Sequence, residues 1–173
     1  VVAIATTVTA AAAVAVACWP LVSPPPKAAD PGTAAAVGFA RARDELLAEA
    51  DDVIQLQCGA ATGAAGPRSG RLRGDIVWSP SRQRGFLRIH GLPPNDPREH
   101  QYQIWIVVGR RPAPVRGGVF DVPPAVGDGG EAVVPILPQE FVQGPVMFAV
   151  TAESPGGSSE FSAARTQAVA RVD

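Results

Sequence analysis

Residues 102–108 have the sequence YQIWIVV and lie past the middle of a chain of 173 residues. In an extended strand, successive side chains point to opposite faces, so Tyr102, Ile104 and Ile106 share one face. Trp105 lies on the other face, between a glutamine and a valine. A strand that is apolar on both faces is usually central in its sheet. We therefore expect one face in the main core and the other beneath a loop or a helix.

Seven more segments have strand character, because they are short, rich in β-branched or aromatic residues and mostly bounded by Gly, Pro, Asn or Asp. They are Val53–Cys58, Leu72–Trp78, Phe86–His90, Val115–Val122, Glu131–Leu137, Pro145–Glu153 and Thr166–Val172. No crossover helix separates them, which argues against a parallel sheet. Residues 53–173 are therefore predicted to be all-β, an antiparallel β-sandwich of about eight strands in two packed sheets.

A short amphipathic helix is predicted immediately before the strands, over residues 34–52. Asp30-Pro31 fits an N-cap followed by proline at the first helical position. Apolar residues then recur at three- and four-residue steps, as on one face of a helix. They are Phe39, Ala42, Leu46, Ala50 and Val53. Such a face packs either on the β domain or against the helix of a second copy in a homodimer, and we favour packing on the domain.

Residues 1–22 (VVAIATTVTAAAAVAVACWPLV) contain no charged side chain. At about 1.5 Å per residue, this segment has roughly the length that crosses a hydrocarbon core of ~30 Å. Trp19 near its end fits an interfacial anchor. We predict a single transmembrane helix here. A Pro-rich juxtamembrane linker is predicted to follow at residues 23–33, stiffened by three consecutive prolines at 24–26.

The apolar segment has three other interpretations: a buried helix, a cleaved signal peptide and the lipidated start of a lipoprotein. A cleaved signal peptide needs an initiator methionine and a basic region, whereas this sequence begins with Val1, so we expect the natural N-terminus upstream. The sequence Ala15-Val16-Ala17-Cys18 resembles a lipobox, which would lipidate Cys18, but alanine occupies the position usually filled by leucine. Only Lys27 lies close downstream, so charge does not set the orientation. Cys18 and Cys58 are not expected to form a disulfide.

The net charge of −1 gives no electrostatic basis for binding nucleic acid, and no nucleic-acid partner is expected. The charge is unevenly distributed along the chain. Residues 68–116 carry ten basic and three acidic side chains, whereas residues 117–173 carry two basic and seven acidic ones. These segments either neutralise each other across a folded domain or leave a functional basic face, and we favour neutralisation.

No pattern in the sequence predicts catalysis, a cofactor or a metal. His90 and His100 flank a Gly-Leu-Pro-Pro turn, but no third ligand lies near them in the sequence. Glu153 and Glu160 bracket Gly156–Ser159, which is typical of a hairpin turn with exposed carboxylates and not of an acid/base pair. The serines lie in turns and lack a G-x-S-x-G elbow. We therefore expect no enzyme, and no catalytic, cofactor-binding or metal-binding residues.

Six segments, taken in order, resemble the C-terminal domain of the anti-sigma-K factor family. They are Gly74–Pro80, Gly85–Ile89, Gly91–Pro94, Tyr102–Val107, Gly118–Phe120 and Phe148–Ser158. The resemblance covers roughly residues 53–160, and the ordered combination is more specific than any single segment. The chain departs from the family pattern in two places: the turn after Gly157 lacks the usual proline, and residues 162–173 diverge.

The resemblance implies an extracytoplasmic β-sandwich, periplasmic or at the cell surface, on a single-pass membrane protein. It also implies an upstream cytoplasmic domain, missing here, that holds an extracytoplasmic-function sigma factor. In similar systems, site-1 type and intramembrane proteases release the sigma factor by stepwise cleavage. Our leading hypothesis is thus the regulatory ectodomain of a membrane-anchored anti-sigma factor. The alternative is an envelope-anchored lipoprotein that binds a ligand through its loops.

Overall fold

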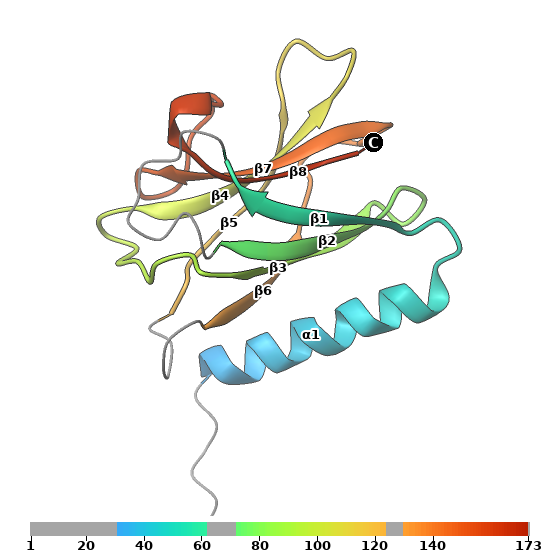
Figure 1. The fold of residues 1–173 in the computed structure, drawn as a ribbon, viewed down its shortest axis with the longest axis horizontal. Coiled ribbons are helices and arrows are strands. Elements are labelled where there is room, and N and C mark those ends of the chain that lie inside the picture. The colour runs from blue at the N-terminus through green and yellow to red at the C-terminus, as the bar shows by residue number, and fades with distance from the viewer. Residues whose placement is uncertain (1–30, 62–71, 124–129, 173) are drawn as a thin grey trace, which may run out of the picture.

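The structure is a computed structural model that describes residues 31–61, 72–123 and 130–172 (Figure 1). The predicted transmembrane helix at 1–22, which includes Cys18, lies outside these ranges, as does most of the predicted linker at 23–33. Among the described residues, no helix has both the length and the apolar character needed to cross a membrane.

In these ranges, one α-helix precedes eight β-strands. Helix α1 spans Pro31–Glu49, so it begins at the proline of Asp30-Pro31 but both begins and ends three residues before the predicted range of 34–52. Residues 31–33 therefore belong to the helix and not to the predicted linker. The strands are β1 (Ile54–Ala60), β2 (Arg73–Ser79), β3 (Arg84–His90), β4 (Gln101–Val108), β5 (Val115–Phe120), β6 (Glu131–Ile136), β7 (Pro145–Glu153) and β8 (Thr166–Arg171). A short 3-10 helix, η2 (Ala163–Arg165), precedes β8. The eight predicted strands are confirmed, with ends that differ by about two residues at most.

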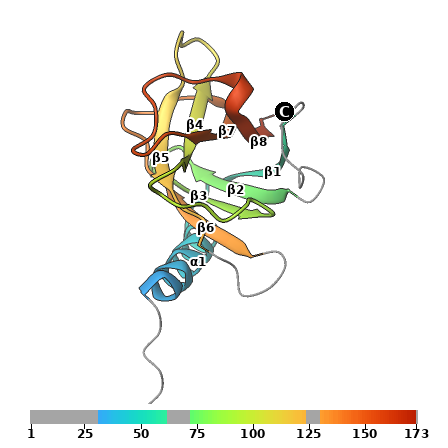
Figure 2. The same ribbon diagram turned by 90° about the vertical axis from the view of Figure 1, so that its left-hand side faces the viewer.

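The strands form one antiparallel sheet in the order β5-β4-β7-β8-β1-β2-β3-β6. This sheet is rolled into a nearly closed, barrel-like form (Figures 1 and 2). Strand β1 joins the two halves, because it pairs with β2 from Ile54 to Gly59 and with β8 at Gly59 and Ala60. The expected pair of separate sheets is therefore replaced by one continuous sheet, since β1 runs past Cys58 far enough to reach β8.

The open side of the sheet lies between its edge strands, β5 and β6. Two backbone hydrogen bonds tie β5 to the residues that follow β6, from Leu137 N to Gly117 O at 2.7 Å and from Gln139 N to Arg116 O at 3.2 Å. Pro135 in β6 has no N–H to offer to an additional strand. The two edges thus protect each other, and the proline discourages pairing with a foreign strand.

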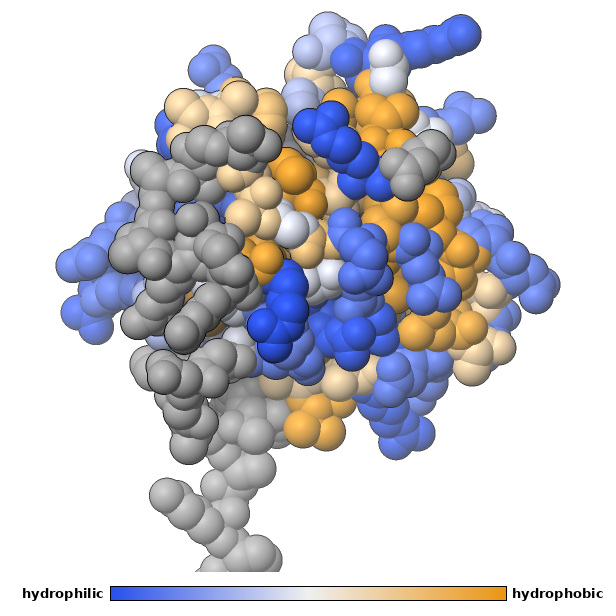
Figure 3. All heavy atoms as spheres, in the orientation of Figure 1, coloured by the Kyte–Doolittle hydropathy of each residue, from blue (hydrophilic) through white to orange (hydrophobic). Residues whose placement is uncertain are grey.

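Residues 137–144 connect β6 to β7 and close one end of the sheet. Val142 is fully buried, and its backbone N–H and C=O are both bonded to the side-chain amide of Gln83, at 2.7 and 2.9 Å. The neighbouring Phe141 is 71% exposed. Apolar residues also form a patch on the right-hand side of the face shown in Figure 3, beside a hydrophilic central band. Within residues 137–144, Val142 therefore fills the interior of the sheet, whereas Phe141, the residue before it, is exposed to solvent.

The inward-facing side chains of all eight strands form the main core. Tyr102, Ile104 and Ile106 belong to it, which confirms the face predicted for them. Trp78 is completely buried beside Phe148, with ring centroids 6.0 Å apart. Because the rolled sheet encloses this core, the residues on its outer face are available to hold other parts of the chain.

Candidate functional site

Helix α1 packs on the outer face of β2, β3 and β6, on the side of the sheet away from the main core (Figures 1 and 2). Val77 of β2 and Phe86 of β3 point out toward the helix and are 0% and 1% exposed. The helix side of this small core consists of Leu46 with Phe39, Ala42, Leu47 and Ala50, and Val53 follows the helix. Packing of the predicted amphipathic helix on the domain is confirmed. We call the contact between α1 and the sheet the helix dock.

An ionic cluster of three side chains crosses the helix dock. Arg43 of α1 donates from Nη2 to Oδ2 of Asp75 in β2. Arg88 of β3 donates from Nε to the other carboxylate oxygen, Oδ1, at 2.6 Å. Asp75 and Arg88 lie opposite each other in the β2–β3 register, so the sheet itself places them together. One carboxylate thus joins a cation of the helix to a cation of the sheet.

The members of this cluster differ in their access to solvent. The side chains of Arg43 and Asp75 are 9% and 12% exposed, whereas that of Arg88 is 43% exposed. The Nε atom of Arg43 is buried and has no hydrogen-bond partner within the described ranges of the chain. A buried donor without a partner costs about 1–3 kcal/mol or more when its group is charged. Arg43 therefore stabilises the helix dock through its ion pair with Asp75 and destabilises it through the burial of its Nε donor.

Asp52 fixes the chain where it leaves the helix. Its Oδ1 accepts a hydrogen bond from the Ser79 hydroxyl at 2.6 Å, and its Oδ2 accepts one from the Ser81 backbone N–H at 2.6 Å. The hydrogen bond from Ser79 and then that from Ser81 lower the pKa of Asp52 below its ordinary value of 3.8. The carboxylate therefore ties the end of the helical segment to the turn between β2 and β3.

Arg82 in the same turn binds the C-terminus of the helix. Its guanidinium donates from Nη2 to the backbone carbonyl of Glu49 at 2.8 Å and from Nη1 to the Glu49 carboxylate at 3.2 Å. A cation at a helix C-terminus satisfies an unpaired carbonyl and interacts favourably with the helix dipole. The helix dock thus has an apolar centre, a buried ionic cluster and a polar anchor at one end.

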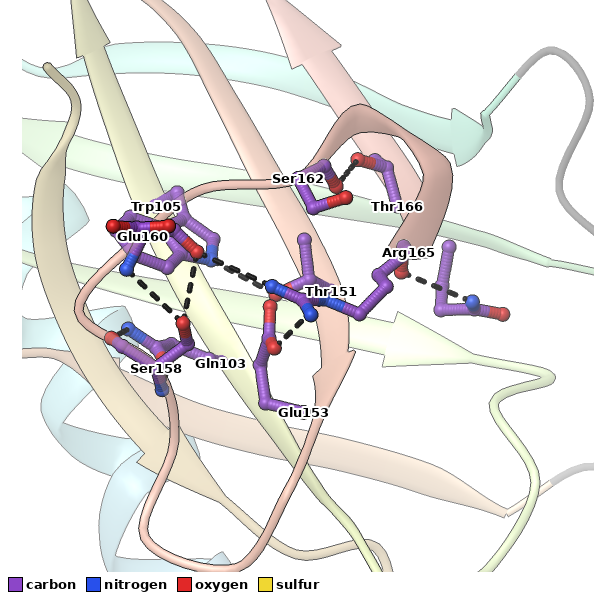
Figure 4. Close-up of polar contacts among 10 residues, drawn as sticks. Gln103, Trp105, Thr151, Glu153, Ser158, Glu160, Ser162, Arg165 and Thr166 are labelled. Atoms are coloured by element: carbon purple, nitrogen blue, oxygen red, sulfur yellow. Dashed lines mark hydrogen bonds and ion pairs between the residues drawn. The ribbon is translucent and has the colours of Figure 1, made fainter.

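A second region covers the outer face of β4 and β7, where residues 154–165 fold back over the sheet (Figure 4). The side-chain amide of Gln103 accepts from Ser158 N at 2.6 Å and donates to Ser158 O at 3.0 Å. Trp105 lies beneath the same segment, with its ring centroid 5.7 Å from that of Phe161 in an edge-to-face arrangement. The loop that was expected over one face of 102–108 is therefore present.

The structure corrects the interpretation of Glu153. We expected an exposed hairpin carboxylate, but Glu153 is 3% exposed and binds Arg165 Nε through Oε2 at 2.9 Å. Its Oε1 is buried, and no residue that the structure describes forms a hydrogen bond with it. The expectation was wrong because residues 154–165 turn back over the end of β7 and are not a short hairpin. Glu160 is exposed as expected, and the predicted turn is confirmed by Gly157 N donating to Ser154 O at 2.9 Å.

The other candidate residues are dispersed. His90 approaches Glu131 of β6, with Nε2 and Oε2 3.0 Å apart, and His100 packs edge-on against Tyr102. No group of three metal-ligating side chains occurs in the described parts of the chain. Cys58 is a free, buried thiol, and burial, with a smaller effect of the Asp75 charge, raises its pKa to about 12. These residues are not assembled into one site.

Sequence reasoning did not single out the polar members of the helix dock. The signal for Arg43 was its spacing, because it follows Phe39 by four residues and precedes Leu46 by three, which places it on the apolar helix face. The signal for Asp75 was its alternation with Val77 in a strand. Their pairing depends on how the helix crosses the sheet, which no local pattern contains.

The described residues define a class of protein, a β domain whose outer face holds the helix that leads into it. The chain belongs to the anti-sigma-K factor family. The model of that family, described as anti-sigma-K factor rskA, C-terminal, matches residues 6–168. It thus covers almost the whole chain, and the resemblance found in the ordered strand segments is confirmed. No curated protein and no solved structure matches the chain.

Proposed function

We propose that the chain has a regulatory role as part of an anti-sigma factor, with a sigma factor as its partner, and its membership of this family supports that role. We propose that residues 53–173 are an extracytoplasmic domain that controls release of an extracytoplasmic-function sigma factor through regulated proteolysis. In this proposal residues 1–22 span the cell membrane once, residues 23–30 link the span to α1, which begins at Pro31, and the sigma factor is held by a cytoplasmic domain upstream of Val1.

The observation that carries this proposal is the state of helix α1. The helix directly follows the proposed linker, and its second half is held on the sheet by the apolar contacts of Leu46 and by the anchor at Asp52. Residues 35–38 are exposed, and Val37 is 65% exposed. Proteases bind extended, accessible chain, so a docked helix resists cleavage and an undocked one does not. The helix dock would therefore limit access to the segment next to the membrane.

The test is to map cleavage in intact membranes from cells under envelope stress. We expect the first regulated cut between Leu21 and about Phe39, by a site-1 type protease, and the next cut inside residues 1–22, by an intramembrane protease. Asp75→Asn, which removes the shared carboxylate, is expected to speed the first cut. Arg41→Met is the matched control, because Arg41 pairs with Glu45 on the exposed side of the same helix.

Two results would contradict this proposal. One is a set of first cuts confined to loops after residue 60, and the other is release of the sigma factor without any cleavage. If the natural chain begins with a short basic segment in place of a cytoplasmic helical domain, the proposal also fails.

A further inference from the structure

The ionic cluster in the helix dock is asymmetric between its two sides. On the sheet, Asp75 keeps Arg88 as a partner whether or not the helix is present, because both residues belong to paired strands. Among the residues that the structure describes, Asp75 is the only buried carboxylate that pairs with Arg43 of the helix, and none is a hydrogen-bond partner of Arg43 Nε. The exposed Asp44 approaches Arg43 Nη1 only at 3.5 Å. Undocking therefore leaves no isolated charge on the sheet and restores water to Arg43.

We propose that Arg43 destabilises the helix dock relative to an apolar residue, and so sets how often α1 leaves a sheet that stays folded. This inference rests on the proposed function, in which departure of α1 admits the protease. Arg43 is a positioning residue that acts on regulation by shifting the equilibrium between the docked and the undocked helix.

The cost of Arg43 follows from the general behaviour of buried ion pairs. Desolvation of two charges often exceeds their attraction, and an apolar side chain of similar volume is then neutral or stabilising. Methionine can fill the space of the arginine stem, because both side chains are long and unbranched near the backbone. With Arg43 absent, the guanidinium of Arg88 has further N–H groups for Asp75 Oδ2 in the paired geometry that carboxylates favour.

Hydrogen exchange measured by mass spectrometry on the purified full chain tests this inference. In Arg43→Met, exchange of the backbone amides of residues 40–49 should slow by roughly 5-fold or more, as expected when an unpartnered buried donor is removed. Exchange in β4 and β7, which do not contact the ionic cluster, should stay unchanged. If Arg43 mainly held the helix in place, the same substitution would accelerate exchange in α1, and that result would overturn the proposal.

Two further variants complete the test. Asp75→Asn removes the negative charge that balances the buried Arg43, so exchange in residues 40–49 should accelerate by at least roughly 10-fold while β4 and β7 stay protected. Equal acceleration in α1, β4 and β7 would mean that the helix and the sheet open together, which also contradicts the proposal. Arg41→Met should change exchange neither in residues 40–49 nor in β4 and β7. If it slowed exchange in residues 40–49 as much as Arg43→Met does, helix propensity would explain the slowing and the proposal would be overturned.

This experiment uses no protease, so its outcome is separate from that of the cleavage map. Slower exchange in Arg43→Met combined with cleavage elsewhere in the chain would support the inference about the helix dock and refute the proposed function. Faster exchange in Arg43→Met combined with cleavage between Leu21 and Phe39 would refute the inference about the helix dock and support the proposed function.

Discussion

Trp105 of β4 donates its indole N–H to the hydroxyl oxygen of Thr151 in the neighbouring strand β7, at 2.8 Å. Both residues are buried, at 1% and 0% exposure, although they lie on the outer face of the sheet and not in the main core. Residues 154–165 exclude water from this face and pack Phe161 against the indole ring. The sheet is therefore covered by the chain in two places on its outer surface, by α1 on one half and by this loop on the other.

Trp105→Ala should lower the free energy of unfolding by about 3–5 kcal/mol, because it removes a large buried side chain and leaves Thr151 without its donor. Trp105→Phe keeps an aromatic ring at this position but removes the indole N–H and part of the ring volume, so a smaller loss of about 1–2 kcal/mol is expected. Denaturant titration of the two variants measures both values. A loss below about 1 kcal/mol for the alanine variant would show that the loop does not seal this face.

Gly157→Ala should loosen residues 154–165 more than Gly156→Ala. Both glycines have positive φ, at +82° and +88°, so both substitutions strain the backbone. Only at Gly157 would the added Cβ lie 2.5 Å from Gln103 Oε1 and 2.8 Å from Val119 Cγ2. The Gly156 variant therefore controls for the backbone effect, which is about 1 kcal/mol or more. The midpoint temperature of thermal unfolding and the solvent exposure of Phe161 should both change more in Gly157→Ala than in Gly156→Ala. Equal changes in the two variants would rule out the steric explanation.

Alkaline pH should destabilise the domain in part through Cys58. Its pKa is raised to about 12 in the folded protein from an ordinary value of 9.0, so the folded state favours the neutral thiol. The stability contribution is therefore complete below pH 9 and is lost as the pH rises toward 12, at up to ~1.4 kcal/mol per pH unit. Cys58→Ala should reduce this slope in denaturant titrations between pH 8 and about 11. Tyr102, whose pKa is also raised by burial, is present in both proteins and does not affect the comparison.

Acid should release the anchor at Asp52. Its folded pKa is lowered, first by the hydrogen bond from Ser79, so the anchor is present above pH 3.8 and is lost as the pH falls through the lower folded value. The Ser81 amide proton, which donates to Asp52, should report this titration by NMR with a midpoint below 3.8. Asp52→Asn should abolish the transition at Ser81. A midpoint at or above 3.8 in the unmodified protein would show that the anchor does not favour the ionised carboxylate.

Most of the strands could be predicted from the sequence because their signals are local. Alternation in Tyr102–Val108 and turn residues such as Gly91 and Gly144 fix where strands begin and end. The rolled single sheet could not be predicted in this way. It depends on the pairing of Gly59 with Val169, two residues far apart in the chain with no distinctive side chains.

The candidate site was predictable only in its apolar part. The three- and four-residue spacing of Phe39, Ala42 and Leu46 contains the information that one face of α1 is buried. Asp52 had been assigned to the helix itself, whereas it follows the helix and binds the turn between β2 and β3. That role depends on where the turn lies after folding, as does the burial of Glu153 under residues 154–165.

The order of elements along the chain also determines how a mechanical load would spread. A tension applied at the N-terminal side enters α1 at Pro31 and reaches Arg43 and Leu46 before it reaches Asp52. Only four residues then separate Glu49 from β1, the strand that joins the two halves of the sheet. While α1 and its anchor hold, they carry the force and shield β1; once they yield, the next contact under load is Ile54 against Trp78, at the start of that joining strand. The helix dock should therefore yield first under tension, before the strand on which the continuity of the sheet depends.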